Sequence, residues 1–264
     1  MIVKAVFNQT IAVCAGFIFS GVTAQALVPT TTNVVSIGAG GHEGNGVAVD
    51  TAGNIYVTGQ HVTSRYDSST ATRYAELGGV EYVVNNRTDF FLMKFDADLN
   101  PLWTRVGGSV EYDFGTAMRV ATNGDVVVSG VFQDNFDLGG VMLTNVTSRR
   151  ADSFVARYDG AGNMLWVETV TGDGGVVIDD VEIDDTGSVY VAGVMYGVAT
   201  FGGTTVGQNY QSKVFLAKYS GAGQFQWAKP VESSSDSGTA ALVIDTNGNV
   251  LVGGMLSSSP AGVF

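Results

Sequence analysis

Apolar and polar positions follow a repeating pattern along this chain. Four short runs are apolar throughout and lack the alternation of a half-exposed strand, which predicts strands that are covered on both faces. The runs are 55–57, 126–128, 189–191 and 250–252. A turn with one glycine precedes each run and another apolar segment precedes each turn, so the pattern predicts four β-hairpins. The turn glycines are Gly53, Gly124, Gly187 and Gly248.

A second set of positions recurs with the same period. Each tryptophan follows a phenylalanine by twelve residues and lies just after a glycine-rich turn. The pairs are Phe91 and Trp103, Phe154 and Trp166, and Phe215 and Trp227. The tryptophans are 63 and 61 residues apart. This period predicts a unit of four antiparallel strands that stacks on copies of itself, with the phenylalanines and tryptophans filling the space between units.

Units of this kind predict an all-β fold, a β-propeller of four-stranded antiparallel blades. The approximate boundaries are 42–107, 113–170, 176–231 and, for a partial unit, 237–264. About 3.5 to 4 blades are present, so we expect an incomplete or open propeller. We interpret the chain as a truncated or frame-shifted piece of a longer repeat protein. The alternative is a small propeller, or one completed by a second chain through its open edge.

The first 26 residues have the composition of a signal peptide. Lys4 precedes an apolar run at 11–22, and Ala24-Gln25-Ala26 is a small-x-small cleavage site. We expect residues 27–264 to form the mature propeller domain, with no transmembrane span, in a secreted, periplasmic or cell-surface location. The one cysteine, Cys14, lies in the signal, so the mature chain would hold no disulfide.

The charge balance excludes some classes of partner. The formal net charge is −12 at pH 7, with 13 Lys and Arg against 25 Asp and Glu. Long-range repulsion therefore disfavours nucleic acid and anionic membrane surfaces. The 36 glycines fit short strands joined by tight turns.

These motifs resemble the SBBP (seven-bladed β-propeller) repeat of bacterial exported proteins. The pattern Asp-x-x-Gly-Asn-(Ile/Val)-Tyr-Val-x-Gly occurs at 50–59 and, with Leu251 for the tyrosine, at 245–254. The pattern Asp-x-Phe followed by Gly-x-x-x-Trp occurs at 152–166 and, with Lys213 for the aspartate, at 213–227. The resemblance covers nearly all of residues 34–264. It implies a propeller on an exported protein and carries no catalytic residues to this chain.

The sequence holds one candidate metal site. Asp180, Glu182 and Asp184 alternate onto one strand face, and carboxylates are preferred ligands of Ca²⁺, although the spacing is not that of an EF-hand. No other cofactor is indicated. His42 and His61 lack a ligand at metal-binding spacing, and we expect them to have a role in a loop or turn. No nucleophile motif or catalytic triad is recognisable.

The prediction for function is a non-enzymatic exported scaffold that binds protein or glycan through loops at a blade edge. The long segment 60–88, with Arg65, Tyr66, Arg73 and Tyr74, is the expected contact region, unless it is only a tolerated insertion. One alternative is a quinone- or calcium-dependent propeller enzyme, because the Gly-x-x-x-Trp turn is similar to the blades of quinone-dependent alcohol dehydrogenases. The other is a fragment of a longer exported repeat protein.

Overall fold

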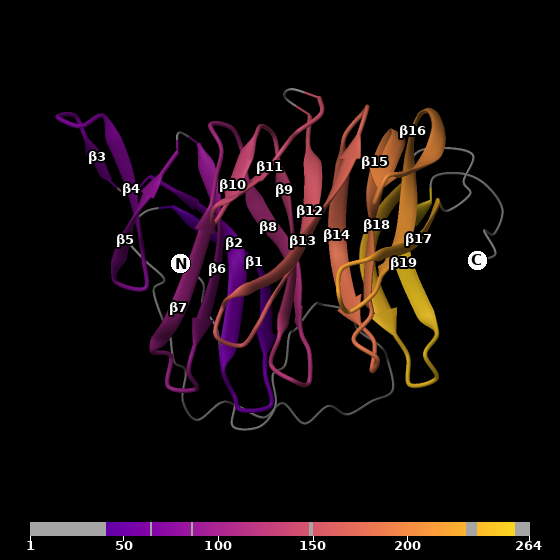
Figure 1. The fold of residues 1–264 in the computed structure, drawn as a ribbon, viewed down its shortest axis with the longest axis horizontal. Helices are drawn as coiled ribbons and strands as arrows, with labels where there is room; N and C mark the ends of the chain where they lie inside the picture. Colours follow the sequence, from indigo (N-terminus) through magenta and orange to yellow (C-terminus); the bar gives the residue numbers. More distant parts are fainter. Residues whose placement is uncertain (1–40, 64, 86, 148–149, 231–236, 257–264) are drawn as a thin grey trace, which may run out of the picture.

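A computed structural model describes residues 41–63, 65–85, 87–147, 150–230 and 237–256. Every regular element in these ranges is a β-strand, and the strands pair in antiparallel sheets (Figure 1). The predicted all-β fold, an incomplete propeller, is confirmed. The predicted signal peptide lies outside the described residues.

The first blade is a four-stranded meander, and its strands hydrogen-bond in chain order. They are β1 (His42–Val49), β2 (Ile55–Val62), β6 (Thr88–Phe95) and β7 (Pro101–Gly107). The apolar run that begins β2 is fully buried, as its lack of alternation predicts.

Two further blades and a hairpin repeat this arrangement. The second blade comprises β8 (Phe114–Val120), β9 (Val126–Phe132), β12 (Asp152–Tyr158) and β13 (Met164–Gly172). The third comprises β14 (Val176–Ile183), β15 (Val189–Phe201), β16 (Thr204–Tyr219) and β17 (Phe225–Pro230). The hairpin that follows pairs β18 (Ser237–Ile244) with β19 (Val250–Leu256). The end of β13 also pairs with β15, which joins the second and third blades into one sheet.

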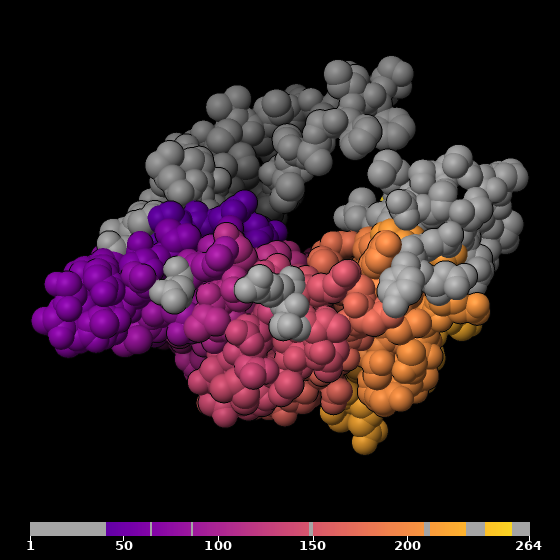
Figure 2. Space-filling view, turned by 90° about the horizontal axis from the view of Figure 1, so that it is seen from above, coloured from indigo at the N-terminus to yellow at the C-terminus, as the bar shows by residue number. Residues whose placement is uncertain are grey.

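The first strands of successive blades pack side by side. Strand β1 contacts β8, β8 contacts β14, and β14 contacts β18. Seen from above, the blades follow one another in an arc that runs from the indigo first blade to the orange third blade (Figure 2). The four first strands therefore form the inner wall of the arc, where a propeller has its axis.

The tight turns between strands owe their shape to aspartate and glycine. In the turn between β1 and β2, the Asp50 carboxylate accepts hydrogen bonds from the backbone N–H groups of Ala52 and Asn54. Gly53 takes a φ of 86°, and Gly124, Gly187 and Gly248 have φ values of 80–84° in the equivalent turns. This conformation costs glycine little and strains other residues.

Neighbouring blades hold each other through two sets of aromatic side chains. Phe154 is fully buried and packs edge-to-face on Phe90 of the preceding blade, with 5.3 Å between the ring centroids. The half-buried indoles reach the other way: Trp103 Nε1 donates to the Gly160 carbonyl of the next blade at 3.2 Å, and Trp166 Nε1 donates to that of Gly221 at 3.0 Å. The second blade therefore contacts the first through Phe154 and the third through Trp166.

The long link in the first blade forms a small sheet, whereas the sequence suggested a loop. Its strands are β3 (Arg65–Asp67), β4 (Thr72–Leu77) and β5 (Val80–Val84). Leu77 is fully buried in a cluster with Ile55, Phe91 and Met93, on the face of blade one that points away from blade two. This small sheet projects at one end of the arc in Figure 1 and covers an apolar face that has no neighbouring blade among the described residues.

A shorter link in the second blade forms a two-stranded hairpin, β10 (Phe136–Leu138) with β11 (Val141–Leu143). In the third blade the corresponding hairpin is continuous with β15 and β16. Within the described ranges there is no helix long and apolar enough to span a membrane.

Candidate functional site

A β-bulge interrupts the first strand of every blade at the same position. The pairing shifts between Gly44 and Gly46 in β1, between Gly115 and Ala117 in β8, and between Ile178 and Asp180 in β14. The extra residues are Asn45, Thr116 and Asp179. A bulge bends its strand and changes the direction of one side chain, and bulges recur next to functional sites. Each blade thus presents one residue outside the regular ladder on the inner wall of the arc.

A glycine on the second strand makes each bulge possible. Gly59, Gly130 and Gly193 lie opposite the bulges. A Cβ atom on Gly59 would overlap the Glu43 carbonyl, and one on Gly193 would overlap that of Val177. On Gly130 a Cβ would lie 2.6 Å from the Phe114 carbonyl oxygen. The bulged strand therefore occupies the volume that a side chain would need.

The three bulge residues line one open cavity of about 470 Å³. Asn45 comes from the first blade, Thr116 from the second and Asp179 from the third. Three further side chains complete the wall: Glu43, Gln60 and Phe114. Sites for small molecules commonly measure roughly 300–1,000 Å³ and combine an apolar wall with a few convergent polar groups. We name this set of six residues the axial cavity.

The polar groups of the axial cavity are oriented by hydrogen bonds. Asn45 Nδ2 donates to the Gly115 carbonyl of the next blade at 2.9 Å. The Thr116 hydroxyl lies 2.9 Å from that of Ser129. Gln60 Nε2 donates to Glu43 Oε2 at 2.6 Å. These contacts restrict the rotamers of the amide and hydroxyl groups, so the cavity is partly preorganised for a polar ligand.

Asp179 is the bulge residue with a formal charge. Burial, and then the neighbouring Asp180 carboxylate, raise the pKa of Asp179 to about 6. In the described residues, no hydrogen-bond or ion-pair donor lies within reach of its carboxylate. At pH 7 the cavity therefore holds an ionised and poorly solvated carboxylate.

The predicted calcium residues are placed a short distance from this cavity. Arg119 of the second blade binds two of them: its Nε lies 2.9 Å from Glu182 Oε1, and its Nη2 lies 3.4 Å from Asp180 Oδ1. Asp180 Oδ2 also accepts the Leu242 N–H at 2.8 Å. These carboxylates connect three successive blades, and calcium would have to displace Arg119 to use them as ligands.

The third predicted ligand, Asp184, has a separate environment. Its carboxylate caps its own turn by accepting the Thr186 and Ser188 N–H groups, each at 2.9 Å. Burial opposes ionisation of Asp184, but these hydrogen bonds outweigh it and the pKa is lowered. Across the described part of the chain, no group of three His, Cys, Asp or Glu side chains gathers in a way that could hold a metal ion.

The two histidines pair with each other across β1 and β2, so the expected loop or turn position was wrong. Their rings lie 6.5 Å apart in an edge-to-face arrangement. His61 is fully buried, and burial, with a smaller contribution from His42, lowers its pKa to about 4. His61 is therefore neutral at physiological pH.

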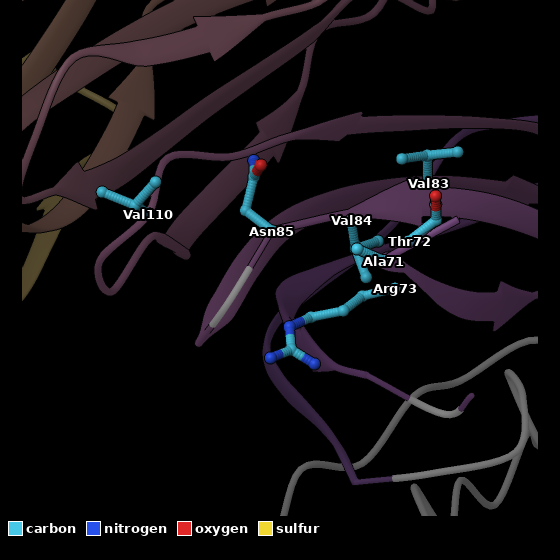
Figure 3. A pocket seen from close by; sticks show the side chains of 7 residues that line it. All are labelled: Ala71, Thr72, Arg73, Val83, Val84, Asn85 and Val110. Carbon is cyan, nitrogen blue, oxygen red and sulfur yellow. The ribbon is translucent and has the colours of Figure 1, made fainter. Parts of the chain in front are cut away.

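The small sheet β3–β5 uses its arginines and tyrosines internally. The Arg65 guanidinium lies 4.1 Å from the Tyr74 ring centroid, and that of Arg73 lies 4.8 Å from Tyr66. A second cavity of about 260 Å³ lies beside this sheet, and Arg73, Asn85 and Val110 are among its lining residues. In Figure 3 the side chains of Arg73 and Asn85 point in different directions and lie apart, so the polar groups of this second cavity do not converge. The axial cavity is the better candidate site for this reason.

Two buried carboxyl groups between the first and second blades predict a pH-dependent stability. Burial is the main cause that raises the pKa of Asp89 to about 7 and that of Asp113 to about 6. Asp89 Oδ2 accepts the Asn85 N–H at 2.6 Å, whereas its Oδ1 has no hydrogen-bond partner. Below pH 3.8 the Asp89 carboxyl is protonated in both the folded and the unfolded chain, so its shifted pKa has no effect on the free energy of unfolding. Between pH 3.8 and about 7 only the unfolded chain loses the proton, so stability falls as pH rises.

We expect Asp89→Asn to be about 2 kcal/mol more stable than the wild type at pH 8 and nearly equal to it at pH 4. Each pKa unit corresponds to about 1.4 kcal/mol, and the loss of the charge-assisted bond from Asn85 offsets part of the gain. Urea unfolding at several pH values measures the difference. A difference that does not change with pH would contradict this assignment.

One spacing in the sequence marks the axial cavity, although it does not by itself predict a bulge. Each bulge residue lies fourteen positions before the glycine that ends its hairpin, namely Gly59, Gly130 or Gly193. Aligning the units on them identifies Asn45, Thr116 and Asp179 as equivalent positions that vary in chemistry while the framework stays constant.

Comparisons with known proteins agree with this framework. The family model described as the SBBP beta-propeller repeat matches residues 37–60. An uncharacterized WD repeat-containing protein of Acanthamoeba polyphaga mimivirus is 27% identical over 212 residues. That alignment covers 70% of this chain and 15% of the viral protein, so the chain spans a small part of that relative.

A crystal structure of a protein of unknown function from Bacteroides caccae overlaps 80% of this chain and 70% of its own, with 11% identity and a TM-score of 0.38. That overlap is too loose to define a shared fold. The resemblance predicted from the glycine and aromatic spacings is confirmed by the family match, which places an SBBP β-propeller repeat at residues 37–60.

Proposed function

We propose that this protein is a non-enzymatic, exported propeller scaffold that binds a glycan in the axial cavity. The proposal depends mainly on one observation, the convergence of three bulge residues from three blades on a cavity that also holds Phe114. Sugar rings combine an apolar C–H face with a rim of hydroxyl groups. The half-buried Phe114 ring can pack on the apolar face of a sugar, and the amide, hydroxyl and carboxylate groups of the cavity can bind its hydroxyl groups.

The proposed location differs from the blade-edge contact region expected from the sequence. The arginines and tyrosines of the β3–β5 sheet pair with one another, and the sheet covers an apolar face, so both have a structural use. The polar groups of the axial cavity come from three different blades and point to one volume. The proposal of export depends on the predicted signal peptide. The proposal of a non-enzymatic role depends on the sequence, in which no catalytic motif is recognisable.

The test is binding to an array of neutral, basic and acidic oligosaccharides, followed by affinity measurements on the best ligand. We expect Phe114→Ala to weaken binding about tenfold, which is about 1.4 kcal/mol, because the apolar wall is lost. Tyr66→Ala is the matched control, since it removes an exposed aromatic ring from the β3–β5 sheet. Thermal unfolding of both variants verifies that they fold.

Three outcomes would contradict the proposal. Binding that is lost in Tyr66→Ala and kept in Phe114→Ala would locate the site on the β3–β5 sheet. No binding to any oligosaccharide would exclude a glycan ligand. Cleavage of the bound oligosaccharide, seen by mass spectrometry, would show that the protein is an enzyme.

A further inference from the structure

The axial cavity has an uneven distribution of charge. Two of its six lining residues, Glu43 and Asp179, carry a carboxylate, and none of the six carries a positive charge. The whole chain has a net charge of −12, so the surrounding field has the same sign. A ligand with negative charge is therefore disfavoured at this site, and one with positive charge is favoured.

The carboxylates of Glu43 and Asp179 differ in their hydrogen-bond and ion-pair partners. Glu43 accepts a hydrogen bond from Gln60 at 2.6 Å. Asp180, next to Asp179, is bound by Arg119 and by the Leu242 N–H. Asp179 has no such partner among the described residues, although burial and Asp180 both oppose its ionisation. The strand bulge separates these neighbours, so that Asp180 stays in the ladder and Asp179 faces the cavity.

The other two bulge positions hold neutral groups that can donate and accept hydrogen bonds. Asn45 and Thr116 suit hydroxyl groups, and Asp179 suits a cationic donor. A metal ion is less well matched, because Ca²⁺ takes about six to eight oxygen ligands and, in the part of the chain that the structure describes, no group of three His, Cys, Asp or Glu side chains gathers around Asp179. An ammonium group needs only a few acceptors in this arrangement.

We infer that the axial cavity selects a glycan that carries a free amino group, as in oligomers of glucosamine, with the ammonium bound by Asp179 and adjacent hydroxyls bound by Asn45 and Thr116. This inference rests on the proposed glycan-binding function and names the class of sugar. Neutralisation of Asp179 removes the cost of an unpaired, partly buried carboxylate, which gives the amino sugar its advantage over an N-acetylated one.

The experiment compares glucosamine and N-acetylglucosamine oligomers of equal length by calorimetric titration at pH 7. For the wild type we expect at least about tenfold tighter binding of the glucosamine oligomer. Asp179→Asn should bring the two affinities within about twofold of each other, mainly by weakening the glucosamine oligomer. Asp185→Asn is the control, since it makes the same charge change at an exposed turn position of the same blade.

The outcomes separate this inference from the function on which it depends. Equal affinity of the wild type for the two oligomers, with Phe114→Ala weakening both, would overturn the amino-sugar preference and leave the glycan site intact. Equal loss of preference in Asp179→Asn and Asp185→Asn would show that net charge, and not Asp179, is responsible. Binding that requires added calcium would also overturn it. No binding of any oligosaccharide would refute the proposed function itself.

Discussion

We expect Gly193→Ala to destabilise the protein by about 3 kcal/mol, because the new Cβ atom would overlap the carbonyl oxygen of Val177. Backbone atoms cannot move aside as a side chain can, so the β14 bulge must shift or the β14–β15 pairing must open. For a chain of this size the change corresponds to a fall in Tm of about 10 °C. Thermal and urea unfolding measure it.

Gly253→Ala is the matched control. This glycine also lies in the second strand of a hairpin, but the nearest atom to an added Cβ is the Ala241 carbonyl oxygen at 3.9 Å. We expect a change within about 0.5 kcal/mol. Gly193→Ala should also weaken ligand binding in the axial cavity, because Asp179 belongs to the displaced bulge. Equal stability of the two variants would refute the role assigned to the glycine opposite each bulge.

The blades could be predicted from the sequence because each depends on local signals. Turn glycines, apolar runs and the Phe-to-Trp spacing repeat three or four times, so chance matches are few. The strand order within a blade follows from short connections between antiparallel neighbours. Each of these signals concerns residues that are close in the sequence.

The axial cavity could not be predicted in the same way. A bulge changes the direction of one side chain without changing the pattern of apolar positions. The sequence therefore does not indicate which of Asp179 and Asp180 faces the cavity. The alternation Asp180, Glu182, Asp184 pointed to one strand face, but it does not show that Arg119 of the preceding blade occupies that face. Distances between blades decide which carboxylate is left for a ligand.

The β3–β5 sheet illustrates a second limit. The length of segment 60–88 was evident from the repeat, and its polar composition favoured an exposed loop. Its buried residues, Ala75 and Leu77, match an apolar face of the first blade that is distant in the sequence. The insertion in the first blade therefore covers an apolar face that the other blades cover by stacking.

Each blade also carries a cation opposite its tryptophan on the paired strand. Lys94 and Arg157 are buried and Lys218 is half-buried. In the first blade Lys94 lies 4.9 Å from the Tyr56 ring centroid and 3.9 Å from Asp50. In the second blade valine replaces the tyrosine and alanine the aspartate. Arg157 there fills the space and pairs with Asp125, four residues further along the turn. The charge pair is preserved although the cation is an arginine and the aspartate comes from another position of the turn. In the third blade Lys218 lies 4.7 Å from the Tyr190 ring centroid and 3.7 Å from Asp184, as in the first blade.

Arg157 makes more of these contacts than its lysine counterpart. Its Nη2 lies 2.9 Å from Asp125 Oδ2, and its Nη1 donates to the carbonyls of Gly187 and Gly221 in the third blade, each at 3.2 Å. The side chain is 7% exposed. The guanidinium therefore connects two turns of the next blade to one turn of its own, and a planar group with several donors is required for that geometry.

We expect Arg157→Met to destabilise the protein by about 4 kcal/mol, because it leaves Asp125 and two carbonyl groups without their donor in a largely buried site. Arg65→Met is the control: it breaks an ion pair with Glu81 of similar length, 3.0 Å, in which both side chains are about half exposed, and should change the stability far less. The double variant Arg157→Met/Asp125→Leu should recover part of the loss, since the uncompensated charge is gone. Equal effects of the two arginine substitutions in urea unfolding would show that the blades are not joined through Arg157.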